Sequence, residues 1–358
     1  MNEAVYALND GSGTRRPPGR WRLPRPVSRP ITRLRSVLLL HRVSTRLLPV
    51  LTDGRQPDWR VHQRLAGQSG TAAALVGPPG EAVAVLKVSD TAGGRECLRR
   101  QAEVLTRLHA DQRLGAWRRL LPRLISTARI GTADCSVESR LPGADGRREL
   151  ADARRRDVLV AAAVAGVGEL SRRTGGLRVA GEDAIVRWVR EPVDAVRAVV
   201  PPRDRPALDR MADELAAGLA GLRVALGWQH GDYTPGNVLV ADGVLTGVID
   251  WGQAVPDGMP VLDVVSFLLN AEAVRARAQL GSVVASWLRS PRRPEHGVLS
   301  GFQRGLGAVP VDPAVLVRLA WLRHVAGNLA ESTVYRDNPL WIRRNVAVVL
   351  RAAGDGGP

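Results

Sequence analysis

The sequence predicts an α+β protein with two lobes, a small antiparallel-sheet N-terminal lobe and a larger, mainly helical C-terminal lobe. Three observations support this prediction. Short apolar runs separated by turn residues precede residue 140, long segments with helical apolar spacing follow it, and one short hairpin interrupts the helical half. The chain has 358 residues, of which 45% are hydrophobic, so it can bury a core in each lobe.

The N-terminal lobe is expected over residues 50–140. The stretch "RLAGQSGTAAALVGPPGEAVAVLKVSD" predicts two strands joined by a Gly-Pro-Pro-Gly turn, with Lys87 near the end of the second strand. A helix is expected at residues 94–110, where one face carries Leu98, Gln101, Leu105 and Leu108. The segments "LPRLISTARI" and "ADCSVES" predict two further strands, and "RLPGADG" ends the lobe.

The C-terminal lobe is expected over residues 141–355. Apolar residues recur there at helical spacing in several segments, which predict helices at residues 150–174, 182–200, 206–226, 260–290 and 313–332.

Residues 1–45 are interpreted as a basic Pro/Arg-rich arm, partly disordered. Residues 14–46 contain ten Arg, five Pro and no acidic residue, a composition that does not favour a core of its own. The net charge of +16 lets such an arm contact an acidic surface, whether nucleic acid, anionic lipid or an acidic partner. A merely solvated tail in an Arg-rich chain is the alternative, and no helix-turn-helix, zinc-finger or RNA-binding signature predicts specific nucleic-acid binding.

The two cysteines, Cys97 and Cys135, have no CxxC spacing and indicate a reducing compartment, without a disulfide framework or a structural zinc site. Apolar runs such as "SVLLL" are too short to span a bilayer, and the N-terminus shows no signal-peptide pattern. A cytoplasmic protein is therefore expected.

Lys87 is the one lysine among 51 basic residues. Lysine is a compact charge on a slim stem that can reach between phosphate groups, whereas the arginine fork is broad and planar. Chance retention of a single lysine is the alternative. Upstream, a flexible loop rich in backbone donors could hold phosphate oxygens, although a plain hairpin would look the same; it contains Gly67, Ser69, Gly70 and Thr71.

The stretch "WQHGDYTPGNVLVADGVLTGVIDWGQA" contains the candidate catalytic and metal-binding residues of the helical half. "NVLVA" and "VLTGVID" flank Asp242-Gly243, a strong hairpin signal. Folding this hairpin brings Asp232 and Asn237 close to Asp250. Such hard oxygen ligands suit Mg²⁺, which favours a few protein oxygens together with substrate phosphates.

"HGDYTPGN" resembles the catalytic loop HGDxxxxN of the aminoglycoside phosphotransferase and choline kinase superfamily, which has a bilobal protein-kinase-like fold. "VIDWG" resembles the kinase DFG segment, and Lys87 resembles the strand lysine that contacts the α- and β-phosphates of ATP. The resemblance covers about residues 60–345. It implies ATP and Mg²⁺ as cofactors.

The resemblance also implies roles for individual residues. Asp232 would accept or orient the proton of the attacking hydroxyl, and His230 would brace the loop. Asn237 and Asp250 would hold Mg²⁺. The segment "VESRLPG", with the backbone around Glu138, would be the hinge where adenine docks, and Asp263 would tie down the catalytic loop.

One position departs from the pattern of the family. A helix Glu pairs with the strand lysine in the family, but the corresponding residue here is Gln101. Either Glu103 or Glu96 reaches Lys87 after a rotation or slip of the helix, or Gln101 replaces the ion pair with a neutral hydrogen bond. We favour Gln101 facing the site.

The implied function is transfer of the γ-phosphate of Mg-ATP to a hydroxyl of a small molecule such as an alcohol, sugar or amino alcohol. The alternatives are a kinase of peptide or protein Ser/Thr, and a non-catalytic or weakly active nucleotide-binding protein, which the Gln101 departure would permit. The many arginines at residues 144–210 argue against a polycationic aminoglycoside as the acceptor.

Overall fold

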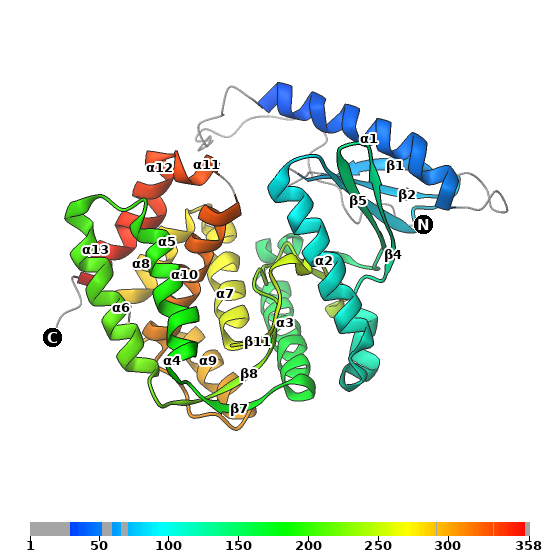
Figure 1. The fold of residues 1–358 in the computed structure, drawn as a ribbon. Coiled ribbons are helices and arrows are strands. Elements are labelled where there is room, and N and C mark those ends of the chain that lie inside the picture. The colour runs from blue at the N-terminus through cyan, green and yellow to red at the C-terminus, as the bar shows by residue number, and fades with distance from the viewer. Residues whose placement is uncertain (1–28, 52–58, 66–70, 291, 332, 355–358) are drawn as a thin grey trace. The chain divides into compact units, whose positions relative to one another are not determined.

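The computed structural model describes residues 29–51, 59–65, 71–290, 292–331 and 333–354. The chain divides into two compact units. The N-terminal unit comprises Met1–Arg107 and Pro122–Ala144, and the C-terminal unit comprises Leu108–Leu121 and Asp145–Pro358. Figure 1 shows a sheet in the first and mostly helices in the second, so the expected α+β class and kinase-like lobes are confirmed.

The N-terminal unit is built on a five-stranded antiparallel sheet with the strand order β1-β2-β3-β5-β4. Its strands are β1 (Arg60–Leu65), β2 (Ala72–Gly77), β3 (Ala84–Ser89), β4 (Leu124–Ile130) and β5 (Ala133–Ser139). Helix α2 (Ala92–Ala110) follows β3 and buries Leu98, Leu105 and Leu108, which lie on the apolar face expected from the sequence. The Gly-Pro-Pro-Gly turn joins β2 to β3.

Helix α1 (Arg29–Leu51) corrects the interpretation of residues 29–45 as part of a basic arm without a packed structure of its own. Its side chains Leu39, Leu40, Val43, Leu47 and Leu48 are buried in one cluster with apolar residues of the sheet. These positions recur three or four residues apart, which gives the helix an apolar stripe despite its many arginines. Figure 1 shows α1 lying along the sheet. Residues 1–28 of the expected arm lie outside the described residues.

The C-terminal unit is mainly helical. Its helices of eight or more residues are α3 (Ala153–Thr174), α6 (Arg205–Leu219), α7 (Val261–Ala276), α8 (Leu280–Leu288), α9 (Pro294–Gly305) and α10 (Pro313–Glu331). Shorter helices are α4 (Glu182–Ile185), α5 (Glu191–Arg197), α11 (Thr333–Arg336), α12 (Pro339–Ile342) and α13 (Val348–Gly354). The core of this unit contains the fully buried side chains of Trp251, Phe267, Trp287 and Trp321.

Short strands complete the fold. They are β6 (Ala144–Asp145), β7 (Gly176–Val179), β8 (Arg223–Gln229), β9 (Val238–Ala241), β10 (Val244–Val248) and β11 (Val255–Gly258). Strand β8 pairs with β7 and β11, and β9 pairs with β10, both antiparallel. Strand β8 leads into the loop that carries the candidate catalytic residues, and the β9–β10 hairpin follows this loop.

Two expected helices differ from the structure. The helix expected at residues 206–226 ends at Leu219, because Gly221 takes a φ of 74° and the apolar segment after it pairs as strand β8. The helix expected at residues 260–290 is two helices, α7 and α8, since Arg277 adopts the left-handed conformation that ends α7. No helix among the described residues combines the length and apolar character needed to cross a membrane.

Candidate active site

The β9–β10 hairpin sets the positions of Asn237 and Asp250. Asp242 and Gly243 have φ values of 50° and 77°, which fit the two-residue turn that the Asp-Gly pair predicts. Val238 pairs with Val248, and the backbone N–H of Ile249 donates to the carbonyl oxygen of Asn237 at 2.9 Å. Asn237 and Asp250 therefore lie at the open end of the hairpin, as the sequence predicts.

Asp232 is held by Asn237. The side-chain Nδ2 of Asn237 donates to the carboxylate oxygen Oδ2 of Asp232 at 2.9 Å and to the backbone oxygen of Asp232 at 2.8 Å. Asn237 is buried, whereas Asp232 is partly exposed. The amide thus orients a carboxylate that remains partly open to solvent.

Asp263, in the first turn of α7, holds the start of the catalytic loop. Its Oδ2 accepts the backbone N–H of His230 at 2.7 Å, and its Oδ1 accepts the backbone N–H of Gly231 at 2.9 Å. Burial raises the pKa of Asp263 to about 6, while these hydrogen bonds to the ionised carboxylate lower it. Gly231 has a φ of 84°, and a Cβ there would lie only 2.4 Å from the backbone oxygen of Gln253.

His230 is a structural brace in this arrangement. Its Nε2 lies 2.9 Å from the backbone oxygen of Ile249, and its Nδ1 accepts the backbone N–H of Asp232 at 3.2 Å. The ring packs against Trp251 with the ring centroids 4.6 Å apart. Burial lowers the pKa of His230 to about 4, so the imidazole is neutral at pH 7 with the proton on Nε2.

The open end of the hairpin fits a magnesium ion in its donor chemistry. Because Nδ2 of Asn237 donates to Asp232, the amide oxygen Oδ1 is the atom that could bind a cation. Asp250 adds a carboxylate from a left-handed backbone position, with φ 64° and ψ 59°. The described residues contain no cluster of three or more His, Cys, Asp or Glu side chains suited to a metal. Two oxygen ligands together with substrate phosphates are the usual protein contribution to a Mg²⁺ site.

Lys87 lies in an ion pair within the N-terminal unit, and its partner is on a strand. Its Nζ is 3.3 Å from Oε2 of Glu138, with side-chain exposures of 12% and 3% for Lys87 and Glu138. The Nε2 of Gln101 on α2 donates to Oε1 of Glu138 at 2.6 Å. Gln101 is buried and faces this pair, which is the orientation that we favour from the sequence.

The alternatives on helix α2 are not observed. Glu96 and Glu103 both pair with Arg99, and all three side chains are more than half exposed. Lys87 instead pairs with Glu138, a residue that the sequence places in the hinge through its backbone. Alternation along the strand places Glu138 on the same sheet face as Ser136, but only the register between β3 and β5 puts Ser136 opposite Lys87.

The backbone of the expected hinge takes part in the sheet. Glu138 pairs with Val85 on one side and with Leu124 on the other. The next backbone N–H, of Ser139, donates to the carbonyl oxygen of Arg123 at 2.8 Å. In the structure, the side chain of Glu138 contacts Lys87 and Gln101.

The expected phosphate loop is only partly described. Gly67, Ser69 and Gly70 lie outside the described residues. Thr71 directly precedes β2 and is half-buried.

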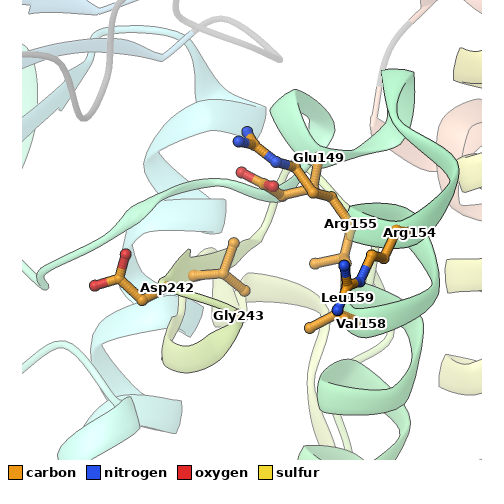
Figure 2. Close-up of a pocket in the computed structure, with 8 residues that line it drawn as sticks. Glu149, Arg154, Arg155, Val158, Leu159, Asp242 and Gly243 are labelled. Atoms are coloured by element: carbon orange, nitrogen blue, oxygen red, sulfur yellow. The ribbon is translucent and has the colours of Figure 1, made fainter.

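A pocket of about 440 Å³ lies in the C-terminal unit at the turn end of the hairpin (Figure 2). Its lining residues are Glu149, Arg154, Arg155, Val158, Leu159, Val240, Asp242 and Gly243. Strands β9 and β10 separate this turn from Asn237 and Asp250 by roughly 13 Å, at about 3.3 Å per strand residue. The pocket is therefore not the site formed by the catalytic loop.

Solved structures with the same fold are phosphotransferases. A thermostable mutant of aminoglycoside phosphotransferase APH(4)-Ia, in ternary complex with ADP and hygromycin B, matches with a TM-score of 0.55 and 16% identity; the match covers 87% of this chain and 99% of that chain. The streptomycin-ATP-APH(2")-IIa ternary complex matches with a TM-score of 0.52 and 13% identity, covering 85% and 94%. These similarities establish a kinase-like fold.

The sequence profile of the phosphotransferase enzyme family matches residues 60–297, which span both units. The chain belongs to this family. A comparison with curated proteins finds no significant match. The resemblance inferred from "HGDYTPGN" and "VIDWG" is thereby confirmed at the level of the family.

Proposed function

We propose that this protein transfers the γ-phosphate of Mg-ATP to a hydroxyl group of a small molecule. The observation that carries this proposal is the hydrogen bond from Asn237 to the Asp232 carboxylate at the end of the hairpin that also bears Asp250. Phosphoryl transfer needs mainly positioning and charge stabilisation, and these three side chains supply both.

Each residue has a distinct role in this proposal. Asp232 orients the acceptor hydroxyl and takes up its proton. Asn237 and Asp250 hold Mg²⁺, which when bound would neutralise charge on the phosphates. The neutral His230 keeps the loop in place through its hydrogen bonds with the backbone of Ile249 and Asp232. Lys87 carries the positive charge for the α- and β-phosphates.

We propose that the acceptor is a small molecule other than a polycation. APH(4)-Ia and APH(2")-IIa were solved with hygromycin B and streptomycin. In the present chain, several acidic side chains at residues 144–210 are paired with arginine: Asp145 pairs with Arg147, Glu169 with Arg172 and Asp209 with Arg197. A polycationic acceptor needs uncompensated carboxylates, so an alcohol or sugar hydroxyl fits this region better.

A cytoplasmic location is expected, in line with the free thiols of Cys97 and Cys135.

The proposal is tested by incubating the purified protein with Mg-ATP labelled on the γ-phosphate and a panel of neutral, anionic and cationic alcohols, sugars and amino alcohols, with a Ser/Thr peptide library included. Transfer to a small acceptor, lost in Asp232→Asn, supports the proposal. Labelled peptides alone would favour a peptide kinase. Nucleotide binding without transfer to any acceptor would favour a non-catalytic binding protein.

A further inference from the structure

We propose that Glu138 on strand β5 is the positioning residue for Lys87, in place of a carboxylate on helix α2, and that Gln101 supports it from this helix. This inference rests on the proposed function, because it assigns Lys87 its counter-ion for nucleotide binding. In this chain the carboxylate is on the strand and the amide is on the helix.

The register of the sheet makes the pair possible. Lys87 is paired with Ser136 across β3 and β5, and Glu138 follows two residues later on β5. Residues two apart on a strand lie on one face, and a diagonal neighbour is within reach of a long side chain. Accordingly, Nζ of Lys87 lies 3.3 Å from Oε2 of Glu138.

Burial makes the carboxylate necessary. Both side chains are largely removed from water, and an ammonium group in such a place needs an opposite charge and further hydrogen bonds. Glu138 supplies the charge through Oε2, and its Oε1 accepts the amide Nε2 of Gln101 at 2.6 Å. The amide N–H of Gln101 is a hydrogen-bond donor and an ionised carboxylate oxygen only accepts, so the two groups satisfy each other.

The same geometry explains why position 101 carries Gln. A carboxylate there would face Glu138 at hydrogen-bond distance, and two adjacent anions repel each other in a buried site. The acids of α2 that could otherwise serve, Glu96 and Glu103, are exposed and bound to Arg99.

A consequence is that the sheet, rather than the helix, holds the charge pair. Lys87 and Glu138 are on adjacent strands joined by continuous pairing from Ala84 to Ser89. Their separation is set by the ladder, so a shift of α2 would remove the supporting amide but leave the ion pair in place. The lysine is thereby kept in position before nucleotide binds.

Three variants test the assignment: Glu138→Gln, Gln101→Glu and the double exchange Gln101→Glu/Glu138→Gln. We expect each single variant to raise KM for ATP by at least about tenfold, because one removes the Glu138 carboxylate beside Lys87 and the other places two carboxylates together. The double exchange restores one acid and one amide, and should bring KM for ATP back to within a few-fold of the unmodified enzyme. Glu103→Gln is the matched control on α2 and should change nothing.

A second readout does not depend on turnover. Because Lys87 is the one lysine in the chain, selective ¹³C labelling of lysine gives a single side-chain NMR signal. Loss of its counter-ion in Glu138→Gln should lower the pKa of the Lys87 ammonium relative to the unmodified chain, and the double exchange should restore it. This measurement stays valid if no acceptor is found, so failure of the proposed function and failure of this inference are distinguishable.

Each possible result either supports or overturns the assignment of Glu138 as the positioning residue for Lys87. An unchanged lysine signal in Glu138→Gln, or a double exchange no better than the single variants, would overturn the proposal. If Glu138→Gln does not fold, recovery of the folded state in the double exchange supports the proposal, and failure to recover contradicts it. A rescue of KM for ATP together with the lysine signal would establish Glu138 as the positioning residue, since a purely structural role would not move both together.

Discussion

The side-chain amide of Asn237 donates to the carboxylate of Asp232 at 2.9 Å. Asn237 directly precedes β9, so the Asp232 carboxylate is oriented by the hairpin that also carries Asp250. Because the carboxylate is already held in one orientation, less conformational entropy is lost when the reacting groups align.

Asp232→Asn should lower turnover by at least about 100-fold while nearly preserving nucleotide affinity, because the change removes the proton acceptor but keeps an oxygen for Asn237. Steady-state kinetics and nucleotide titration measure the two effects. Asp242→Asn is the matched control: it lies at the turn of the same hairpin in a positive-φ position that Asn tolerates, and it should leave turnover unchanged. Near-normal turnover of Asp232→Asn would remove Asp232 from the mechanism.

Asp250→Asn should weaken Mg-ATP binding by at least about tenfold and raise the Mg²⁺ concentration needed for half-maximal turnover, because it removes the negative charge that holds the metal. Asn is preferred to Ala here, since Asp250 has a φ of 64° and Asn accepts that backbone conformation. An unchanged Mg²⁺ dependence would contradict the metal assignment.

Lys87→Arg should lower turnover by about 100-fold, because the guanidinium is wider than the ammonium and would displace the phosphates by about 1 Å. The side chain of Lys87 is only 12% exposed and lies against Glu138, so little room is left for the fork. The reverse change at a solvent-exposed ion pair, Arg129→Lys beside Asp134, is the control and should alter turnover by less than a few-fold. Equal effects at both positions would show that Lys87 has no special role.

The stabilising effect of His230 should depend on pH. Its pKa is lowered from 6.5 to about 4 by burial, so its contribution is fully present above pH 6.5 and is lost as pH falls through about 4. The loss amounts to about 1.4 kcal/mol per pH unit within this window. Asp263, with its pKa raised from 3.8 to about 6, acts in the opposite direction: its contribution is present below 3.8 and is lost as pH rises through about 6.

The two effects are separated by comparing urea unfolding of the unmodified chain with that of His230→Gln between pH 4 and 7. The difference in free energy of unfolding should shrink as the pH falls, because only the unmodified chain carries the buried imidazole. His41→Gln, at an exposed position of α1, should show no such trend. A constant difference for His230→Gln would contradict a buried neutral imidazole.

Truncation should distinguish helix α1 from the residues before it. Removing residues 1–51 takes away five buried apolar side chains, including Val43 at 0% exposure, and should lower Tm by well over 5 °C. Removing residues 1–28 leaves that cluster intact and should change Tm by less than about 2 °C. Thermal unfolding followed by circular dichroism measures both, and a large loss in the shorter truncation would show that residues 1–28 contribute to packing.

The local features of this protein follow from its sequence, because they depend on residues close together in the chain. The strands around Lys87 were predictable from apolar runs and turn residues, and the hairpin from Asp242 and Gly243. The meeting of Asn237 with Asp250 was predictable as well, since a two-residue turn determines which residues lie opposite each other.

Long-range partners were decided only by the tertiary structure. The sequence predicts a hinge role for Glu138 and does not predict its pairing with Lys87. This pairing depends on the register between β3 and β5, which no local pattern determines. Likewise, the arginines of α1 obscured an apolar stripe that becomes evident when Val43 and its neighbours pack on the sheet. Both contacts join segments distant in sequence, and their stability comes from burial that exists only once the sheet has formed.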